Sequence, residues 1–290
     1  MSTPIRFAVT AASGELGRLV VAELARRVGP ESVTAIVRDP ARAAGLFPAG
    51  VTVRQGDYDQ PETLVAALDG VERLLLISSN AVGARVPQHR NAIDAAKKAG
   101  VQNLIYTSVL HADTSRLGLA EEHRQTEALI VASGIPHTIL RNGWYTENYA
   151  ASILPALQHG AFIGSARDGR ISSAARTDYA EAAAIALLDD KAPANAVLEL
   201  AGDSAYTLTE FAAELSRQTG RQIPYVDLPE ADYRGALVGA GLPAPLAGLL
   251  ADSDVAAADG ALFDEGRTLS SLLGRPTTPF ATSVATALKG

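Results

Sequence analysis

The sequence predicts an α/β fold with a doubly wound parallel sheet and a smaller, mixed, helix-rich C-terminal lobe. Three observations carry this prediction: a glycine-containing turn close to the N-terminus, an alternation of short apolar runs with helix-like stretches over the first half, and a change of character after about Gly143. The chain has 290 residues and is 47% hydrophobic, so it can bury the large core that such a fold requires.

The first element is an apolar run over residues 5–9, which residues 10–17 join to a helix-like stretch over residues 19–28. A strand, a tight turn and a helix in this order are typical of a Rossmann-type dinucleotide site, because the N-terminal end of a helix attracts a pyrophosphate. The candidate cofactor residues of this turn are Ala11, Ala12, Ser13, Gly14, Glu15, Leu16 and Gly17.

Two glycines give the turn its expected function. Gly14 would let backbone amides approach the phosphates, and Gly17 would let the helix pack close to the strand. Ala11 stands where the dinucleotide fingerprint has its first glycine, so the tight turn must be made by a residue with a Cβ. An ordinary strand-to-helix turn is therefore an alternative.

The second strand, expected over residues 33–37, predicts which cofactor is bound. This continuous apolar run ends in Arg38, about twenty residues after the turn, where such folds select their nucleotide. A guanidinium suits a 2′-phosphate, so NADPH is favoured over NADH. Asp39 is followed by Pro40, which is typical of a helix N-cap and gives Asp39 a structural role. The alternative for Arg38 is a solvated arginine at a strand end.

Further strands and helices alternate along the first half of the chain. Helices are expected over residues 61–68, with a capping box from Asp59 to Glu62, and over residues 87–99, closed by Gly100. Right-handed crossovers between such elements produce a doubly wound sheet that binds ligands at the carboxyl ends of its strands. The remaining strands of this half are expected over residues 51–55, 71–78, 103–108 and 136–141.

The C-terminal half is expected to be mixed and rich in helix. One helix, over residues 208–219, follows a capping box from Thr207 to Glu210. We therefore predict a dinucleotide-binding domain over residues 1–143 and a substrate lobe over residues 144–290, with the chain free to cross between them. Other helices are expected over residues 145–158 and 178–188, and strands over residues 197–201 and 223–228.

Composition excludes several kinds of function. The chain has no cysteine, and its five histidines lack metal-ligand spacing, so no metal site is expected. The net charge of −7 argues against nucleic acid as a partner. No stretch has the length of a membrane span, and the start Met1 to Pro4 lacks the pattern of an export signal. A cytoplasmic protein with a small-molecule partner is expected, and a homodimer is left open.

Several stretches resemble a known family. They read LLLISS at 74–79, AVGARVPQHRN at 81–91, YTSVLHADTS at 106–115, LRNGWY at 140–145 and LADSDV at 250–255. With the glycine turn, they make the chain similar to the NmrA-like branch of the atypical short-chain dehydrogenases, and within it to the NAD(P)H:quinone oxidoreductases. The resemblance covers nearly the whole chain and implies an NADPH-dependent quinone reductase. Ala11 is the main departure from the family pattern.

The resemblance also implies site residues. Gly14 and Gly17 would lie in the cofactor loop, and Arg38 would face the adenosine phosphate. A fourth strand would end beside the nicotinamide ribose, and the segment from Asn142 would run along the nicotinamide and the substrate. The cofactor residues implied at these two places are Ile77, Ser78, Ser79, Asn142, Gly143, Trp144 and Tyr145.

One pair of residues is missing. Ordinary short-chain dehydrogenases use a Tyr-x-x-x-Lys pair to move a proton to or from an alcohol oxygen, but none of the eight tyrosines here has lysine four residues later. Ser108 stands at the appropriate strand end, and His123 and Glu127 have the spacing of the pair. An electron-poor quinone needs mainly alignment with the nicotinamide, because its protons can come from water.

Three residues are candidates for catalysis. Asn142 follows an apolar strand and could orient the nicotinamide or the quinone; its alternative is a strand-ending turn with Gly143. His123 could donate a proton, or form an ordinary i, i+4 pair with Glu127. Tyr145, with Trp144, could stack on a quinone or be plain core.

Two further features of the sequence allow more than one interpretation. His111 could line the cleft or cap the turn after Ser108. A second class of function also stays open, in which the chain is a redox sensor that binds NADP(H) without turnover, as some NmrA-like proteins do. An isomerase or sugar-nucleotide enzyme is disfavoured by the missing pair.

Overall fold

The computed structural model describes residues 6–190 and 195–289. The expected start of the first strand at Ile5, and the segment Met1 to Pro4, lie outside the described residues. The chain forms two compact units. Unit 1 comprises Met1–Ala112, Glu122–Asn142 and Tyr179–Leu198, and unit 2 comprises Asp113–Glu121, Gly143–Asp178 and Glu199–Gly290. A break after residue 142 lies next to the predicted boundary at 143, but residues 113–121 join unit 2 and residues 179–198 return to unit 1, which the predicted ranges did not include.

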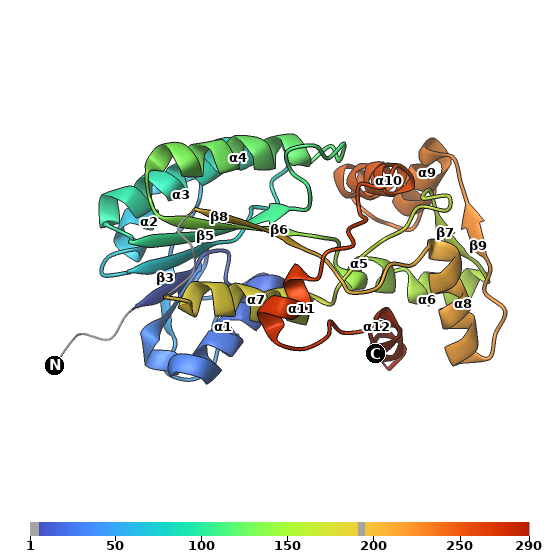
Figure 1. The fold of residues 1–290 in the computed structure, drawn as a ribbon, viewed down its shortest axis with the longest axis horizontal. Coiled ribbons are helices and arrows are strands. Elements are labelled where there is room, and N and C mark those ends of the chain that lie inside the picture. The colour runs from blue at the N-terminus through green and yellow to red at the C-terminus, as the bar shows by residue number, and fades with distance from the viewer. Residues whose placement is uncertain (1–5, 191–194, 290) are drawn as a thin grey trace. The chain divides into compact units, whose positions relative to one another are not determined.

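Unit 1 is built on a seven-stranded sheet with strand order β3-β2-β1-β4-β5-β6-β8 (Figure 1). The neighbouring pairs from β3 to β6 are parallel, with Phe7 of β1 opposite Val33 of β2 and Arg73 of β4. The order reverses between β1 and β4, which is the switch point where doubly wound sheets bind ligands. The strands are β1 (Phe7–Val9), β2 (Val33–Val37), β3 (Thr52–Gln55), β4 (Arg73–Leu76), β5 (Asn103–Val109), β6 (His137–Asn142) and β8 (Ala196–Leu200).

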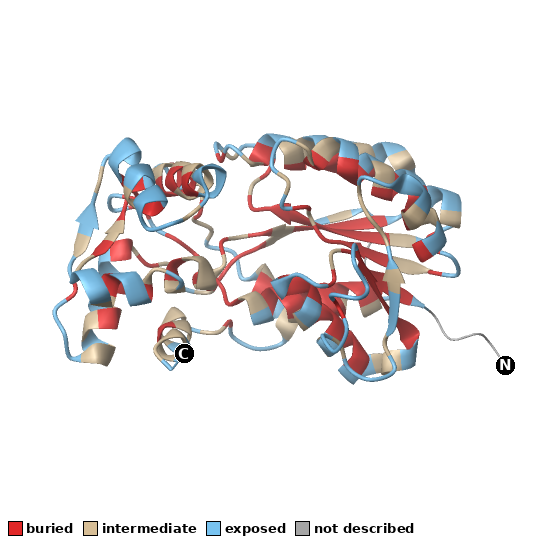
Figure 2. Cartoon of the chain, turned by 180° about the vertical axis from the view of Figure 1, so that it is seen from behind, coloured by how far each residue is buried: buried red, intermediate tan, exposed pale blue. Residues whose placement is uncertain are grey.

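Helices cover both faces of this sheet, as the sequence predicts for a doubly wound fold. In Figure 1, α2, α3 and α4 lie on one face and α1 and α7 on the other. Buried residues concentrate along the strands and on the helix faces that meet them (Figure 2). These helices are α1 (Glu15–Val28), α2 (Pro61–Ala67), α3 (Arg85–Ala99), α4 (Ala120–Ser133) and α7 (Arg176–Leu188), and a 3-10 turn, η1 (Pro30–Ser32), follows α1.

Unit 2 contains a two-stranded parallel sheet and most of the remaining helices. β7 (Phe162–Gly164) pairs with β9 (Tyr225–Asp227). The capping box at α8 is confirmed: Thr207 accepts from the N–H of Glu210, whose side chain accepts from the N–H of Thr207. The helices are α5 (Thr146–Ala150), α6 (Ile153–His159), α8 (Leu208–Thr219), α9 (Glu230–Gly239), α10 (Ala244–Ala258), α11 (Thr268–Leu273) and α12 (Phe280–Ala287).

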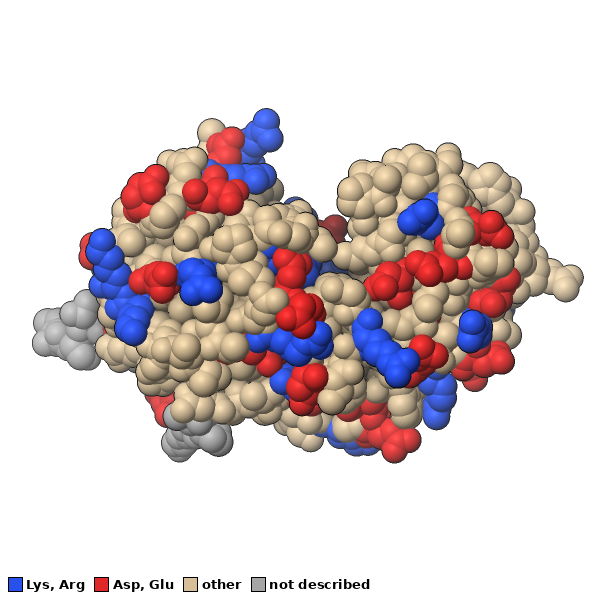
Figure 3. Space-filling view, turned by 90° about the horizontal axis from the view of Figure 1, so that it is seen from above, with Lys and Arg blue, Asp and Glu red and all other residues tan. Residues whose placement is uncertain are grey.

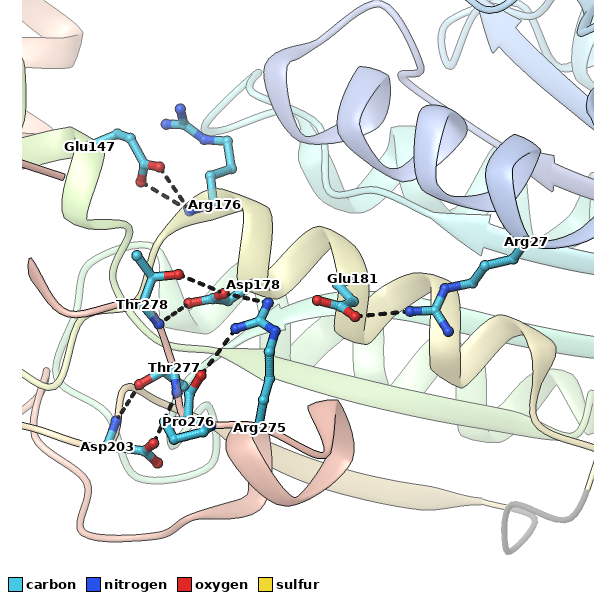
Figure 4. A network of polar contacts seen from close by, with 10 residues as sticks. All are labelled: Arg27, Glu147, Arg176, Asp178, Glu181, Asp203, Arg275, Pro276, Thr277 and Thr278. Atoms are coloured by element: carbon cyan, nitrogen blue, oxygen red, sulfur yellow. Dashed lines mark hydrogen bonds and ion pairs between the residues drawn. The ribbon is translucent and has the colours of Figure 1, made fainter. Parts of the chain in front are cut away.

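A buried carboxylate holds the segment between α11 and α12 (Figure 4). Asp178 is fully buried and accepts hydrogen bonds from Nη2 of Arg275 at 2.9 Å, from the N–H of Thr278 at 2.7 Å and from its hydroxyl at 3.0 Å. Asp203 and Thr277 bond reciprocally beside it, each donating its N–H to the other's side chain at 2.9 Å. These contacts fix the C-terminal part of unit 2 to residues more than 70 positions earlier.

Two element predictions were wrong. The expected capping box from Asp59 to Glu62 does not form, because α2 begins at Pro61 with Gln60 as an N-cap that makes no side-chain bond. The helix expected over residues 145–158 is divided into α5 and α6. Pro155 has no N–H to bond the carbonyl of residue 151, so it fits the first turn of a new helix but not the interior of a continuous one.

Surface charge is mixed. On the face in Figure 3, acidic and basic side chains are interspersed. Among the described residues, we find no helix with both the length and the hydropathy to cross a bilayer.

Candidate functional site

The glycine turn after β1 has the geometry expected of a phosphate-binding loop. Gly14 is the N-cap of α1, lies exposed and has no side chain that could cap the helix, so no side chain of the N-cap residue stands between the helix N-terminus and an anionic ligand. Gly17 is buried, and a Cβ there would lie 2.6 Å from the carbonyl oxygen of Ala11 and 2.7 Å from Cα of Ala12. Gly17 therefore permits the close approach of helix and strand, as predicted.

Ala11 makes the tight turn in a conformation that usually requires glycine. Its φ is +48°, in the left-handed region, and its carbonyl accepts the N–H of Gly14 at 3.0 Å. A Cβ in this region costs roughly 1–2 kcal/mol. The turn of the dinucleotide fingerprint is thus kept, with strain at the position where the first glycine is missing.

Ala11→Gly is expected to stabilise the protein by roughly 0.5–1 kcal/mol, since relief of the left-handed strain exceeds the added flexibility of the unfolded chain. Urea denaturation of the variant and the parent measures the effect. Ala12→Gly serves as the control: Ala12 is buried and outside the left-handed region, so this change should destabilise. A less stable Ala11→Gly protein would show that the turn carries no such strain.

The ends of β1 and β4 are joined by the side chains of Thr10 and Tyr58, which the sequence analysis missed. Thr10, directly after β1, donates its hydroxyl to the carbonyl of Leu75 and accepts the N–H of Ile77 at 3.0 Å. The hydroxyl of Tyr58 lies 2.6 Å from Oγ1 of Thr10 and 2.7 Å from the carbonyl oxygen of Ile77. This pair sets the spacing of the two strand ends at the switch point, where doubly wound sheets bind ligands.

Arg38 lies at the end of β2, the place on which the prediction of a 2′-phosphate contact depends. It is exposed, directly after β2, and its guanidinium has no hydrogen bond or ion pair with any of the described residues 6–190 and 195–289. Asp39 has the capping role expected of it, since Oδ1 accepts the N–H of Ala41 at 3.0 Å and of Arg42 at 3.2 Å, although the segment it caps is a turn and not a helix.

The end of β5 carries a buried polar triad. Oγ of Ser108 donates to Oε1 of Glu127 at 2.5 Å, and Arg141 binds both oxygens of the same carboxylate, at 3.1 and 2.8 Å. Ser108 and Glu127 are less than a tenth exposed. The hydroxyl proton of Ser108 is thus committed to Glu127, so this serine does not offer it to a substrate oxygen as it would in an ordinary short-chain dehydrogenase.

His123 has partners other than the expected Glu127. Its Nδ1 lies 2.8 Å from the hydroxyl of Tyr106, and its Nε2 lies 3.4 Å from Nη1 of Arg85. Burial, with the charge of Arg85 and the nearby His89, lowers the pKa of His123 to about 3. The imidazole is therefore neutral at physiological pH and is a poor proton donor, and the predicted i, i+4 pair with Glu127 is wrong.

Asn142 ends β6 with an amide that lacks partners. The residue is 5% exposed, and neither Oδ1 nor Nδ2 has a hydrogen bond within the part of the chain that the structure describes. Buried amides are normally bonded, so an orphaned one at a ligand-binding sheet edge fits a polar ligand. The backbone carbonyl of Asn142 accepts the N–H of Leu110. The next residue, His111, has a φ of +52°.

The residues after Asn142 belong to unit 2. Trp144 is 8% exposed and packs on Tyr149, with ring centroids 6.5 Å apart, which agrees with the alternative that Trp144 is plain core. Tyr145 is partly exposed, and the guanidinium of Arg176 lies 4.9 Å from its ring centroid. Gly143 donates its N–H to the carbonyl of Leu200 at 2.7 Å.

Together these features fit a dinucleotide. An uncapped helix N-terminus suits the pyrophosphate, the guanidinium of Arg38 suits a phosphate on the ribose, and the orphaned amide of Asn142 suits the polar end of a nicotinamide. The fold and the site thus define a protein of the NAD(P)H-binding class.

Comparison with known proteins agrees with this class. A family model described as NAD(P)H-binding matches residues 11–190, and the chain belongs to that family. It is 56% identical to quinone oxidoreductase 2 of Escherichia coli over 96% of this chain and 97% of that protein. A crystal structure of the NADPH-dependent quinone oxidoreductase of Escherichia coli with NADPH superposes with a TM-score of 0.93 at 55% identity, covering 97% of this chain and 99% of that one. Triphenylmethane reductase of Citrobacter sp. with NADP(H) has a TM-score of 0.92 at 35% identity, covering 97% and 99%.

Proposed function

We propose that this protein is an NADPH-dependent quinone reductase that converts a quinone to a quinol by a two-electron hydride transfer. The observation that carries the proposal is the likeness to quinone oxidoreductase 2 over nearly the full length of both chains. The relative solved with NADPH has the same fold, with a TM-score of 0.93, which supports the choice of cofactor.

The proposal gives each part of the site a task. The turn around Gly14 binds the pyrophosphate through backbone N–H groups, and Arg38 pairs with the 2′-phosphate. The amide of Asn142 orients the nicotinamide or the quinone. NADPH supplies the hydride when bound, and the quinone takes up that hydride and one proton to become a quinol.

The triad at Ser108 favours a quinone over a ketone. Reduction of a simple ketone needs a positioned acid, and in this chain the hydroxyl of Ser108 donates to Glu127 while His123 is a neutral imidazole. A quinone accepts hydride without such an acid, because the quinolate oxygen is a weak base that water can protonate. The chain then has to supply alignment more than acid catalysis.

The direct test mixes the purified protein with NADPH and a small benzoquinone and follows the loss of nicotinamide absorbance. Oxidation of NADPH that depends on both enzyme and quinone, together with no reduction of acetone or cyclohexanone, is the expected result. Tight binding of NADPH without turnover of any of several quinones would reject the reductase and favour the redox sensor.

Arg38→Ala is expected to weaken NADPH binding by roughly 1.5 to 3 kcal/mol, or about 10- to 150-fold, and to leave NADH binding almost unchanged, since only NADPH carries the 2′-phosphate. Titrations with both cofactors, followed by nicotinamide fluorescence, measure the two dissociation constants. Arg26→Ala is the matched control. Arg26 lies near the C-terminal end of α1, at the far end of the helix from the glycine turn, and pairs with Glu23. Equal weakening of both cofactors would mean that Arg38 supports the fold and not the phosphate.

A further inference from the structure

Ser79, three residues beyond Leu76 at the end of β4, is held by α3 through its N–H, its carbonyl and its hydroxyl. Its N–H donates to Nε2 of His89 at 2.9 Å, and its carbonyl accepts from Nε of Arg85 at 2.6 Å. Its hydroxyl donates to Oε1 of Gln88 at 2.5 Å. Each of the four residues is less than a tenth exposed, so these bonds are shielded from water. We call Arg85, Gln88 and His89 the α3 clamp.

Side chains beyond the clamp, from Asp59 and Thr126, hold Gln88 and His89 in place. Nε2 of Gln88 donates to both carboxylate oxygens of Asp59, at 3.0 and 3.1 Å, and this contact is what Asp59 makes in place of the expected capping box. Nδ1 of His89 lies 2.9 Å from the hydroxyl of Thr126, which donates its own proton to the carbonyl of Glu122. Nδ1 must therefore carry the ring proton, and Nε2 is left as the acceptor that Ser79 requires.

Electrostatics keep His89 in the form that the clamp needs. Burial, together with the charge of Arg85, lowers the pKa of His89 to about 3, so the ring is neutral at physiological pH. A protonated His89 could not accept from the N–H of Ser79. The charge of Arg85 is balanced nearby, where Oε1 of Glu122 accepts the backbone N–H groups of Gly83 and Arg85.

The clamp lies next to the switch point of the sheet, where a ligand is expected. Ser78 and Ser79 follow the strand on one side of the switch point, and the phosphate-binding turn follows the strand on the other side. Ser78 donates its N–H to Oγ1 of Thr107 in the neighbouring strand β5 at 2.9 Å, so the segment after β4 is held on that side as well. Neither Gly14 nor Arg38, which would supply most of the binding energy for the phosphates of a dinucleotide, is part of the clamp or bonded to Ser79.

We propose that Arg85, Gln88 and His89 are positioning residues: by fixing the peptide of Ser79, they hold the strand end against which the nicotinamide is aligned for hydride transfer. This inference rests on the proposed function. Misplacement of a reacting group by about 1 Å can cost on the order of 100-fold in rate, whereas the phosphate contacts would keep the affinity for NADPH. Loosening the clamp should therefore lower the rate constant of hydride transfer and not the affinity.

The test compares His89→Leu with His89→Gln. Leucine removes the acceptor, whereas the side-chain carbonyl of glutamine can accept the N–H of Ser79 in place of Nε2. His89→Leu is expected to slow single-turnover hydride transfer at saturating NADPH by roughly 10- to 100-fold, with a dissociation constant for NADPH within about threefold of the parent value. His89→Gln is expected to recover most of the rate.

A matched control is His137→Leu. His137 is a buried histidine at the start of β6, so it lies at the amino ends of the parallel strands and not at the carboxyl ends near Ser79. Its Nδ1 bonds the carbonyl of Ile135 at 2.9 Å. The variant His137→Leu should lose stability, as His89→Leu does, but should transfer hydride at the rate of the parent protein. If His89→Leu does not fold, Gln88→Met provides the same comparison, because it keeps the length of the side chain and removes the bond to Ser79.

A second readout separates the clamp from the proposed function. The fluorescence lifetime of bound NADPH reports how rigidly the nicotinamide is held, and it needs no quinone. It is expected to shorten in His89→Leu and to stay at the parent value in His89→Gln and His137→Leu. Equal lifetimes in all four proteins, or hydride transfer in His89→Leu no slower than in His137→Leu, would overturn the clamp. A parent protein that reduces no quinone, yet shows the lifetime pattern, would reject the reductase and keep the clamp.

Discussion

Gly14→Val should abolish most NADPH binding while the protein stays folded. A Cβ on Gly14 meets only the carbonyl oxygen of Ala11, at 3.3 Å, so the turn has to shift by a few tenths of an ångström, and the φ of −70° at Gly14 suits any residue. We expect the fold to accommodate this small shift. The branched side chain would nevertheless occupy the exposed space in which phosphates approach the helix N-terminus. We expect the dissociation constant to rise by at least about 100-fold, or ~2.7 kcal/mol. Fluorescence titration with NADPH measures it, and circular dichroism checks the fold.

Two control variants define the result. Gly17→Val should instead destabilise the fold, because its Cβ would meet backbone atoms of Ala11 and Ala12 at 2.6 to 2.8 Å. Gly235→Val, in α9 of unit 2, has no atom within 4 Å of the new Cβ and should leave NADPH binding unchanged. Normal binding of NADPH by Gly14→Val would show that the turn does not hold the phosphates.

Asn142→Ala should slow hydride transfer by roughly 100-fold, and His123→Ala by less than about tenfold. Asn142 presents an orphaned amide at the strand end, and its loss would loosen whatever that amide orients. His123 is buried and its pKa of about 3 keeps the imidazole neutral at physiological pH. A neutral imidazole is a much weaker acid than an imidazolium, so His123 is not expected to protonate the substrate. Single-turnover rates at saturating NADPH, on variants shown to be folded, measure both effects.

The opposite order of effects would change the mechanism. A loss of about a thousandfold in His123→Ala, with Asn142→Ala close to the parent, would make His123 the replacement for the missing tyrosine. A moderate loss at His123 has another source, since its Nε2 contacts Arg85 of the α3 clamp. The fluorescence lifetime of bound NADPH distinguishes that indirect effect from the loss of a proton donor.

Local patterns in the sequence predicted the fold well where one segment alone decides the structure. β2 covers the predicted residues 33–37, because a short run with four apolar residues out of five is typical of a strand buried on both faces of a sheet. The box at Thr207 likewise depends on residues three positions apart. β7 was missed, since three residues between a turn and a loop carry no periodic signal.

Contacts between distant segments explain what the sequence could not predict at the site. Spacing alone paired His123 with Glu127, but Glu127 binds Ser108 and Arg141 from two strands, and no pattern within α4 contains that information. The α3 clamp did leave a signal. Arg85, Gln88 and His89 lie at positions i, i+3 and i+4, so they share one helix face, and a polar stripe facing a sheet must find buried partners.

The repeated passage of the chain between the two units limits how the cofactor-binding unit could be transferred to another protein. The chain crosses at 112/113, 121/122, 142/143, 178/179 and 198/199, so the cofactor-binding unit is not a continuous segment. A fragment ending at residue 143 would lack α7, whose buried Tyr179, Ala183 and Leu187 cover the sheet, and would leave β6 as an unpaired edge. The nucleotide-binding half therefore cannot move between genes as one continuous cassette.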